Sequence, residues 1–538
     1  MATVTQTPTT ESTQKSRTFE TIQPGPFRNE PLTDFTKPEN AQAMKAAIEK
    51  VRKELGREYP LVIGGQKVQT TGKIKSINPA HPSEVVGVFQ KADKAEVEPA
   101  MNAALEAFET WSRVPAEERA QLILRVAKTI RERKHEFSAW MIFEVGKNWA
   151  EADADTAETI DFAEFYAREA LRLAKAETPV QLPGERDELW YIPLGVGIVI
   201  PPWNFPGAIM AGMTMASIVC GNTVILKPSS DSPAISRFFF SILEECGMPG
   251  GVVNFCPGGG GTFGDALLSH PKTRYIAFTG SREVGLHVNK VAADVAKGQI
   301  WIKRTILEMG GKDAIIVDSE ADIDAAVEGV AVSAFGFQGQ KCSACSRLIL
   351  DQKVYDGFIE KLKARVEKIQ VGEPTENVAM GPVVNEGSMK SILGYIEQGK
   401  RDGRLITGGK RVEGKDGFFI EPTVFADIKP GTKLECEEIF GPVLAVIKSR
   451  DFNHALEIAN DTEFGLTGAI YSKNEEKLKK GAREFHVGNL YLNRKCTGAM
   501  VGAHPFGGFN MSGTDSKAGG PDYLFLFTQA KSVARKIQ

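Results

Sequence analysis

Apolar residues recur every three or four positions over residues 94–173, which places them on one face of a helix. The spacing is carried by Val97, Met101, Leu105 and Phe108, and again by Leu122, Val126 and Ile130. It predicts a run of amphipathic helices. Closer to the start, residues 41–55 predict a helix ended by Gly56, and residues 61–65 predict a strand and a turn. Residues 180–192 are charged and extended in pattern.

Beyond Gly195 short apolar runs alternate with helical runs such as residues 235–245. This alternation is typical of βαβ units around a parallel sheet. The predicted strands form two series, so we expect two α/β lobes joined near residues 303–307. The strands are residues 197–200, 223–226, 252–255 and 275–278, then 314–317, 348–350, 443–447 and 468–471. Residues 521–533 alternate apolar and polar positions and predict an edge strand, either plain or pairing with another subunit.

The composition is that of a large globular protein with nearly balanced charge. Hydrophobic residues make up 42% of the 538, and 65 Lys and Arg stand against 68 Asp and Glu. The net charge of −3 argues against a nucleic-acid partner and against a basic membrane-binding face. The longest apolar runs, such as residues 209–220, are too short to span a bilayer, and no signal peptide opens the chain. We therefore expect no membrane association.

The number and spacing of cysteines and histidines bear on the cellular location and on metal binding. Seven cysteines are spread over the chain, an odd number that fits a reduced protein, so we expect a cytoplasmic location. The seven histidines show no metal-binding spacing, and no metal is expected. Residues 1–35 are rich in Thr, Ser, Gln and Pro and predict an arm that is mobile or docks elsewhere.

The strongest candidate chemistry lies in residues 339–347, between a predicted helix and a predicted strand. Cys342 in such a loop is a candidate nucleophile, because a thiolate attacks carbonyls well. Cys342 and Cys345 also form a CxxC pair, which fits a redox couple or half of a zinc site. An isolated cysteine is more often a small buried apolar residue.

Two glycine-containing stretches compete as a phosphate-binding turn. Residues 259–264 match GxGxxG after a predicted strand, and Glu283 lies about 20 residues on, as a ribose-binding acid should. Residues 278–285 also lead from a strand into a turn whose amides could face a pyrophosphate. Neither stretch has the GK[ST] of a P-loop, which excludes that class, and spacing alone does not decide between them.

Six motifs, in this order and spacing, resemble the aldehyde dehydrogenase family over roughly residues 60–535. They are residues 202–206, 226–229, 278–281, 307–312, 339–342 and 438–442. The resemblance implies an α/β, aldehyde dehydrogenase-like fold with two Rossmann-type parallel-sheet domains and a small β oligomerisation flap. The implied parts are an N-terminal arm and helix at 1–55, an NAD-binding domain at 56–173 and 195–303, a catalytic domain at 306–515, and the flap at 174–194 and 516–538.

The resemblance also assigns chemical roles. Cys342 would attack the aldehyde to give a thiohemiacetal and then a thioester. The Asn204 side chain and the Cys342 amide would stabilise the oxyanion, and Glu308 would activate water to release the acid. Acyl-CoA-forming relatives typically lack this base, so a free carboxylate is the expected product. NAD would be held by Pro202, Trp203, Lys227, Ser229, Ser230, Gly280, Ser281, Gly285, Glu438 and Phe440. Because Ser230 stands where NAD-preferring relatives often have an acid, use of NADP is also expected.

Residues 339–344, 485–491, 493–499 and 505–508 resemble the branch that acts on L-glutamate γ-semialdehyde, the 1-pyrroline-5-carboxylate dehydrogenases. That substrate carries a carboxylate and an ammonium remote from the aldehyde. The Ser343 hydroxyl and two exposed backbone amides could anchor the carboxylate. Two phenylalanines could sandwich the aliphatic chain, and Glu158 could meet Ser343 or the ammonium, or transfer protons. The implied substrate-binding residues are Glu158, Phe205, Lys341, Ser343, Gly498, Ala499 and Phe506.

The expected reaction is NAD-dependent oxidation of glutamate semialdehyde to glutamate, the second step of proline breakdown, by a homo-oligomer. The chain is too short to include a proline dehydrogenase domain as well, so a separate protein is expected to supply that activity. Three alternatives stay open: another semialdehyde dehydrogenase, such as one for succinic semialdehyde; a catalytically silent scaffold; and a thioredoxin-like role for Cys342 and Cys345.

Overall fold

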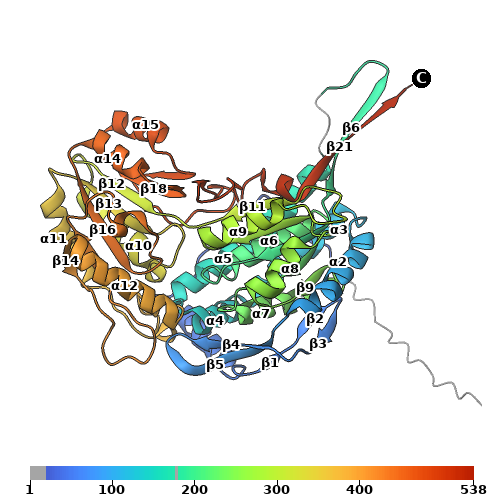
Figure 1. The fold of residues 1–538 in the computed structure, drawn as a ribbon, viewed down its shortest axis with the longest axis horizontal. Coiled ribbons are helices and arrows are strands. Elements are labelled where there is room, and N and C mark those ends of the chain that lie inside the picture. Colours follow the sequence, from blue (N-terminus) through green and yellow to red (C-terminus); the bar gives the residue numbers. More distant parts are fainter. Residues whose placement is uncertain (1–19, 176–179, 538) are drawn as a thin grey trace, which may run out of the picture.

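The computed structural model describes residues 20–175 and 180–537. Two seven-stranded sheets form the centres of two lobes, and a two-stranded arm projects from one lobe (Figure 1). The beginning of the predicted N-terminal arm and residues 176–179 of the predicted flap lie outside the described residues. The α/β fold class expected from the sequence is confirmed.

The first sheet has the strand order β11-β10-β7-β8-β9-β2-β3. It is parallel from β11 to β9, and β2 and β3 add to it in antiparallel fashion. Its strands are β2 (Leu61–Ile63), β3 (Gln66–Val68), β7 (Val196–Ile200), β8 (Thr223–Leu226), β9 (Val253–Phe255), β10 (Tyr275–Thr279) and β11 (Arg304–Glu308). The central strands are continuous apolar runs because helices cover both faces of the sheet.

The second sheet has the order β14-β15-β16-β13-β12-β18-β19 and is parallel except at β14. Its strands are β12 (Asp313–Val317), β13 (Cys345–Asp351), β14 (Arg404–Thr407), β15 (Thr423–Ala426), β16 (Val443–Ser449), β18 (Thr467–Tyr471) and β19 (Asn489–Leu492). Alternate residues of β12 enter two separate apolar cores, with Ile315 in one and Ile316 in the other. Both faces of this sheet are therefore covered.

From β7 onward the helices largely alternate with these strands, as the sequence pattern predicts, whereas α2 to α5 follow one another directly. In the first lobe they are α1 (Pro38–Arg52), α2 (Val97–Trp111), α3 (Ala116–Glu132), α4 (Lys134–Val145), α5 (Trp149–Ala174), α6 (Ala208–Val219), α7 (Pro233–Glu245), α8 (Asp265–Ser269) and α9 (Arg282–Ala293). In the second they are α10 (Ile323–Phe335), α11 (Tyr355–Val366), α12 (Glu386–Asp402), α13 (Lys433–Cys436), α14 (Phe452–Asn460) and α15 (Glu475–Glu484). The helical prediction for residues 94–173 is confirmed by α2 to α5.

The connection between the lobes falls later than the sequence pattern indicates. β11 pairs with β10 from Arg304 to Glu308 and is therefore an edge strand of the first sheet. Residues 306–308, expected at the start of the catalytic domain, lie in this strand. Glu308 is its last residue and also bridges to Gly513, so it stands where the chain passes from one lobe to the other.

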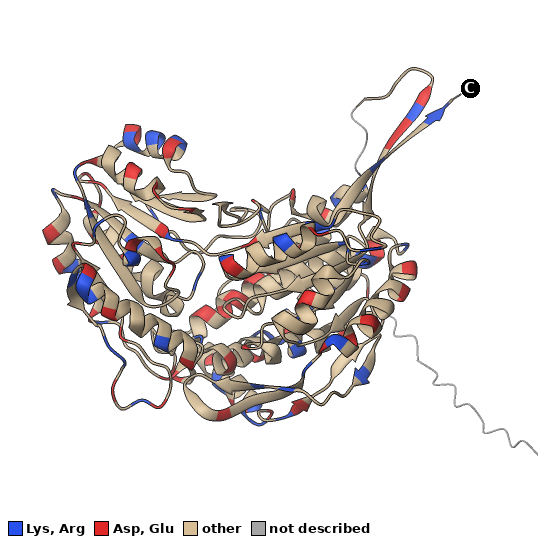
Figure 2. Cartoon of the chain, viewed as in Figure 1, with Lys and Arg blue, Asp and Glu red and all other residues tan. Residues whose placement is uncertain are grey.

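Three small assemblies complete the fold. The projecting arm pairs β6 (Glu185–Pro193) antiparallel with β21 (Thr528–Lys536) (Figure 1). A three-stranded sheet contains β1 (Glu58–Tyr59), β4 (Lys73–Asn78) and β5 (His81–Gln90), and a two-stranded one pairs β17 (Phe464–Gly465) with β20 (Phe509–Asn510). No helix in the described ranges is both long and apolar enough to cross a membrane. In the view of Figure 2, acidic and basic residues are interspersed along the outer helices.

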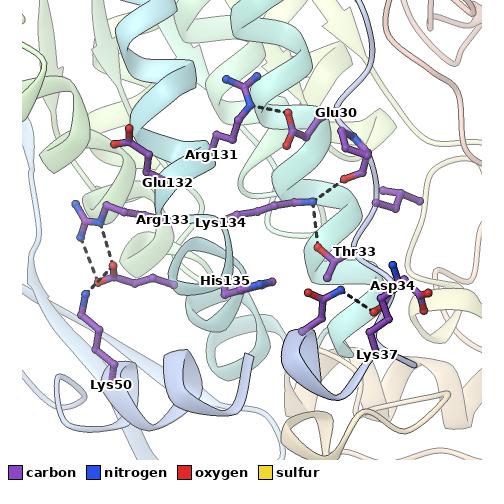
Figure 3. Close-up of a pocket in the computed structure, with 14 residues that line it drawn as sticks. Glu30, Thr33, Asp34, Lys37, Lys50, Arg131, Glu132, Arg133, Lys134 and His135 are labelled. Carbon is purple, nitrogen blue, oxygen red and sulfur yellow. Dashed lines mark hydrogen bonds and ion pairs between the residues drawn. The ribbon is translucent and has the colours of Figure 1, made fainter. Parts of the chain in front are cut away.

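The described part of the N-terminal arm docks on the first lobe. The Asn29 side chain and the Glu30 amide donate to the Asp161 carboxylate at 2.8 and 2.6 Å. The Thr33 hydroxyl donates to Asp153 at 2.6 Å. Both acids belong to α5, so the arm is fastened along that helix. A cavity of about 590 Å³ lies beneath it, lined by this arm and by the end of α3 and start of α4 (Figure 3).

Candidate active site

The candidate nucleophile follows an unusual turn at the end of α10. Phe337, Gln338 and Gly339 have successive φ values of 47°, 57° and 68°, a left-handed conformation that disfavours the two non-glycine residues. The Gln338 side chain compensates by donating to the carbonyls of Gly146 and Pro382 at 3.2 and 2.7 Å. A Cβ at Gly339 would lie 2.3 Å from a backbone carbonyl oxygen, so this position requires glycine.

Asn204 is attached directly to this turn. Its side-chain nitrogen donates to the backbone carbonyl of Gln340 at 3.0 Å, and the Asn204 side chain is almost fully buried. The Gln340 side-chain oxygen in turn accepts the Val384 amide at 2.9 Å. An asparagine amide carries two N–H donors, and this contact uses one. The other donates no hydrogen bond to a described residue.

Glu308 is held by the segment that follows the second sheet. The Ser516 hydroxyl donates to Oε1, whereas Oε2 is buried and has no hydrogen-bond partner among the described residues. Burial raises the pKa of Glu308 to about 8, although the Ser516 hydrogen bond and the charge of Lys517 oppose the shift. A carboxyl group with this pKa can accept and return a proton near neutral pH.

The surroundings of Cys342 favour the protonated form of its thiol. Burial raises its pKa well above the ordinary value, and the negative charges of Asp313, Glu308 and Glu438 add to the shift. The Ser343 amide donates to the sulfur and opposes it. Cys342 must therefore lose its proton as it attacks, in contrast to cysteines held as thiolates by a neighbouring cation.

The CxxC cysteines face different surroundings. Cys345 is buried and makes a side-chain hydrogen bond with Cys496, which is distant in sequence. All seven cysteines are free, and no cluster of three or more potential metal ligands occurs in the described residues. The geometry therefore associates Cys345 with Cys496 in the core of the second lobe.

Of the two glycine stretches, the second leads into the longer helix. Residues 260–264 form one π-helical turn before the five-residue α8, whereas β10 leads into the twelve-residue α9. Ser281 caps α9, its hydroxyl accepting the Val284 amide at 3.4 Å. A Cβ at Gly280 would lie 2.6 Å from the Phe278 ring, and one at Gly285 would lie 2.4 Å from a methionine sulfur. Both positions therefore require glycine.

The other expected cofactor residues lie around the same strand ends. Lys227 is buried and donates to the Gly258 carbonyl at 3.2 Å, and burial lowers its pKa to about 8. Glu438 accepts the Gly311 amide at 2.9 Å, and burial raises its pKa to about 7. The rings of Trp203 and Phe440 meet edge to face at 5.5 Å. Of the remaining expected residues, Pro202 is buried, Ser229 is half-buried and Ser230 is exposed.

Next to Asn204, the Phe205 ring packs against a buried ion pair that the sequence did not predict. Lys147 lies 4.0 Å from the Phe205 ring centre and 4.6 Å from that of Phe337, in cation–π contact with both. Its ammonium donates to Asp155 at 2.8 Å, and both side chains are fully buried. Asp155 also accepts the Ala208 amide at 2.6 Å. The pair therefore lies beneath the rings that flank the oxyanion donor and the nucleophile turn.

Some of the expected substrate-binding residues already bond to other residues of the protein, whereas others do not. Lys341 forms an ion pair with Glu151 at 2.7 Å, so its charge is already partnered. Glu158 makes no hydrogen bond or ion pair with any described residue, and burial together with Asp155 raises its pKa to about 8. Phe506 exchanges backbone hydrogen bonds with Ala518 and is half-buried.

The segment containing Gly498 and Ala499 is tied to the nucleophile turn. The Cys496 thiol and the Thr467 hydroxyl each donate to the Ser343 carbonyl at 3.4 Å. The Ser343 hydroxyl and the amides of Gly498 and Ala499 donate no hydrogen bond within the described ranges. They are therefore available to a ligand.

The cavity of Figure 3 is separate from this site. Arg131 and Arg133 on its wall pair with Glu30 and Glu136, and Lys134 donates to Thr33 at 3.2 Å. These side chains satisfy one another and fasten the arm. The cavity contains none of the residues expected to take part in the reaction.

The two parallel-sheet lobes, the capped α9 and the turn before Cys342 fit the class expected from the sequence, an aldehyde dehydrogenase. A model of the aldehyde dehydrogenase family matches residues 66–533, and the chain belongs to this family. A relative named 1-pyrroline-5-carboxylate dehydrogenase from Geobacillus kaustophilus is 58% identical over 95% of this chain and 99% of its own length.

Solved structures agree with this placement. A 1-pyrroline-5-carboxylate dehydrogenase from Thermus with bound NAD is 53% identical, has a TM-score of 0.94, and is matched over 95% of this chain and 99% of its own. Proline utilization A from Bdellovibrio bacteriovorus is 43% identical with a TM-score of 0.93, over 96% of this chain but 54% of its own.

Proposed function

We propose that this chain oxidises L-glutamate γ-semialdehyde, formed from 1-pyrroline-5-carboxylate, to L-glutamate with reduction of NAD. The observation that carries the proposal is its 58% identity, across nearly the whole of both chains, to a relative named for this substrate. The chemistry of the site supports it, because a thiol, an amide donor and a carboxyl group of raised pKa gather there. The reaction is the second step of proline breakdown.

In the proposed first step, the Cys342 sulfur attacks the aldehyde carbon and loses its proton. The carbonyl oxygen becomes an oxyanion, which the free N–H of Asn204 and the Cys342 amide stabilise. The bond between Asn204 and the Gln340 carbonyl fixes the donor in advance, so little reorganisation is needed. Loss of hydride from the resulting thiohemiacetal leaves a thioester on Cys342.

In the proposed second step, Glu308 removes a proton from water as the water attacks the thioester. Cys342 leaves as a thiolate and recovers its proton, and glutamate is released. The unpartnered Oε2 of Glu308 is the oxygen available to that water. The pKa of about 8 keeps part of the carboxyl groups ionised at neutral pH and makes them stronger bases than ordinary carboxylates.

The residues around β10 fit a dinucleotide cofactor. The N-terminal amides of α9 suit a pyrophosphate, and the buried Lys227 ammonium suits a ribose hydroxyl. Glu438 suits the nicotinamide ribose, with Phe440 packing nearby. When bound, NAD supplies the acceptor for the hydride. Ser230 places no carboxylate beside a 2′-phosphate, so NADP is accepted as well.

The wider assignments follow from the same proposal. The first sheet forms the NAD-binding domain, the second forms the catalytic domain, and β6 with β21 forms the flap that joins subunits of a homo-oligomer. Seven free cysteines favour a reducing cytoplasm. A proline-oxidising activity supplies the substrate, and the match to proline utilization A supports this link.

A substrate panel tests the proposal. NADH formation is measured with 1-pyrroline-5-carboxylate, succinic semialdehyde and propanal. We expect the highest kcat/KM for the first, with all activity lost in Cys342→Ala. An equal or higher kcat/KM for succinic semialdehyde would refute the substrate assignment, and unchanged activity in Cys342→Ala would refute the mechanism.

A further inference from the structure

Two adjacent cations after β19, Arg494 and Lys495, differ in their contacts. The Arg494 guanidinium donates to the carbonyls of Thr497 and Gly498 at 3.2 and 3.0 Å and lies 4.4 Å from the Tyr491 ring centre. It therefore fastens the turn. Lys495 makes no hydrogen bond or ion pair with any residue of the described ranges and is exposed.

The Lys495 ammonium lies against the turn that presents the free amides. A Cβ built on Gly498 would meet Lys495 Cε at 3.3 Å and Nζ at 3.5 Å. Gly498 itself has a φ of 78°, which orients its amide and that of Ala499 in a turn. Three uncharged donors therefore lie near the Lys495 ammonium. They are the amides of Gly498 and Ala499 and the hydroxyl of Ser343, whose carbonyl accepts the Cys496 thiol.

Two other lysines of the site already have counter-ions. Lys341 pairs with Glu151 and Lys147 pairs with Asp155, both in α5. Lys341 and Arg494 lower the pKa of Lys495 in addition to its partial burial, whereas Glu151 opposes them. Adding a carboxylate beside Lys495 would relieve this repulsion between like charges.

Among the carboxylates near these cations, Glu158 has no partner. Its electrostatic neighbours are Asp155, Asp161, Lys147 and Lys341, and both lysines favour its ionised form. Beside the free amides, the described residues therefore include a lysine without a partner, Lys495, and Glu158 is a carboxyl group without one. Glutamate semialdehyde carries one carboxylate and one ammonium on the same carbon, which complements this arrangement.

We propose that Lys495 is a specificity-determining residue that pairs with the α-carboxylate of the substrate, while the neighbouring uncharged donors orient that carboxylate. The inference rests on the proposed function. Uncharged donors bind a carboxylate, an amide or a hydroxyl, so they discriminate weakly among polar substrates. An unpaired ammonium adds selectivity because it gains a charge partner only from an acidic substrate.

Lys495→Gln tests this role. We expect KM for glutamate semialdehyde to rise roughly 5- to 30-fold, with kcat nearly unchanged and propanal turnover unaffected, since a loss of one or two kcal/mol corresponds to this factor. Lys495→Arg should recover part of the loss. Lys429→Gln is the matched control. Lys429 follows β15 near the opposite end of the same sheet, is exposed, and its ammonium makes no hydrogen bond or ion pair with a described residue.

Inhibition by the product and by two stable analogues gives a second test. L-Glutamate and glutarate contain a carboxylate at the position opposite the reacting end, whereas 4-aminobutyrate lacks the α-carboxylate. In Lys495→Gln the inhibition constants of the first two should rise by a similar factor, and that of 4-aminobutyrate should not change. A loss shared by all three would overturn the proposal, because it would show a general disturbance of the turn.

The controls separate this inference from the proposed function. If the wild-type protein prefers glutamate semialdehyde but Lys495→Gln keeps its KM within twofold, the inference alone fails. If the wild-type protein shows no preference over propanal, the proposed function fails and the inference fails with it. Thermal midpoints of the three variants establish that each is folded when it is assayed.

Discussion

The residues around Cys342 share one electrostatic property: burial favours their neutral forms. Burial raises the pKa of Glu308 to about 8 and that of Glu438 to about 7, and it raises the pKa of the Cys342 thiol well above its usual value. Burial lowers the pKa of Lys227 to about 8. Glu308, Glu438 and Lys227 can therefore change protonation state close to neutral pH, whereas the Cys342 thiol loses its proton only at a free-energy cost.

The ionisation of Glu308 predicts the pH dependence of turnover. Because the base must be deprotonated, hydrolysis of the thioester should accelerate as pH rises through about 8 and level off above it. Single-turnover glutamate release, followed after NADH formation is complete, measures this step. A midpoint near the ordinary carboxylate pKa, or the same pH limb in Glu308→Gln, would contradict the assignment.

The family resemblance proposes Cys342, Asn204 and Glu308 as the reactive residues, because each lies in one of its short motifs. The residues that hold them in position could not be predicted. Lys147 meets Phe337, Gln340 meets Val384, and Ser516 meets Glu308 only after the two lobes have folded. A lysine just after the apolar helix α4 is the one local signal, and its partner Asp155 resembles the other acids of α5.

The buried pair predicts a stability effect. Lys147→Met leaves Asp155 charged without its cation and should destabilise the fold by about 3–5 kcal/mol. Lys147→Met with Asp155→Asn should recover much of this loss, because asparagine can still accept the Ala208 amide. Thermal midpoints at fixed protein concentration measure both effects. A double variant no more stable than the single one would contradict the role of the uncompensated charge.

Among the elements, the turn at the end of α10 departs most from ordinary backbone conformation, because successive residues have positive φ. The sequence predicts a helix here, followed by a loop with Cys342. The residue types at Phe337 and Gln338 do not indicate a positive φ. Tertiary hydrogen bonds from Gln338 to Gly146 and Pro382 override the local preference. The strands and long helices follow the sequence pattern more closely because their periodicity is local.

Gly339→Ala tests the turn. The added methyl would lie 2.3 Å from the Gly441 carbonyl and must displace the chain just before Cys342. We expect kcat to fall about 100-fold, since a displacement near 1 Å costs that much. The control is Gly357→Ala in α11, where an added Cβ meets no atom within 4 Å. Equal kcat values in the two variants would contradict a positioning role for the turn.

At the scale of the whole molecule, the two sheets converge on the site from opposite lobes. The sequence predicts the two strand series, but it places the join before the end of β11, because an edge strand at a boundary resembles the start of the next lobe. The family resemblance puts β6 and β21 in one flap, but the residue pattern alone does not pair them, since more than 300 residues separate the strands. An isolated two-stranded ribbon is marginally stable in water. We therefore expect a second copy to cover it.

Trp190→Glu in β6 tests this expectation. The tryptophan is 47% exposed in one chain, and a charge buried at a subunit contact would cost several kcal/mol. Sedimentation should show dissociation of the homo-oligomer. Leu405→Glu in β14, an exposed apolar residue at the edge of the second sheet, should leave the assembly intact. An unchanged sedimentation coefficient in Trp190→Glu would exclude the arm as a subunit contact.

The covalent route through Cys342, completed by Glu308, is tested most directly by trapping the thioester. Glu308→Gln is mixed with NAD and 1-pyrroline-5-carboxylate, NADH is followed, and the intact protein and its peptides are weighed by mass spectrometry. We predict a burst of about one NADH per site, little further turnover, and a glutamyl adduct on the Cys342 peptide. Sustained turnover without an adduct, or an adduct on another cysteine, would contradict the mechanism.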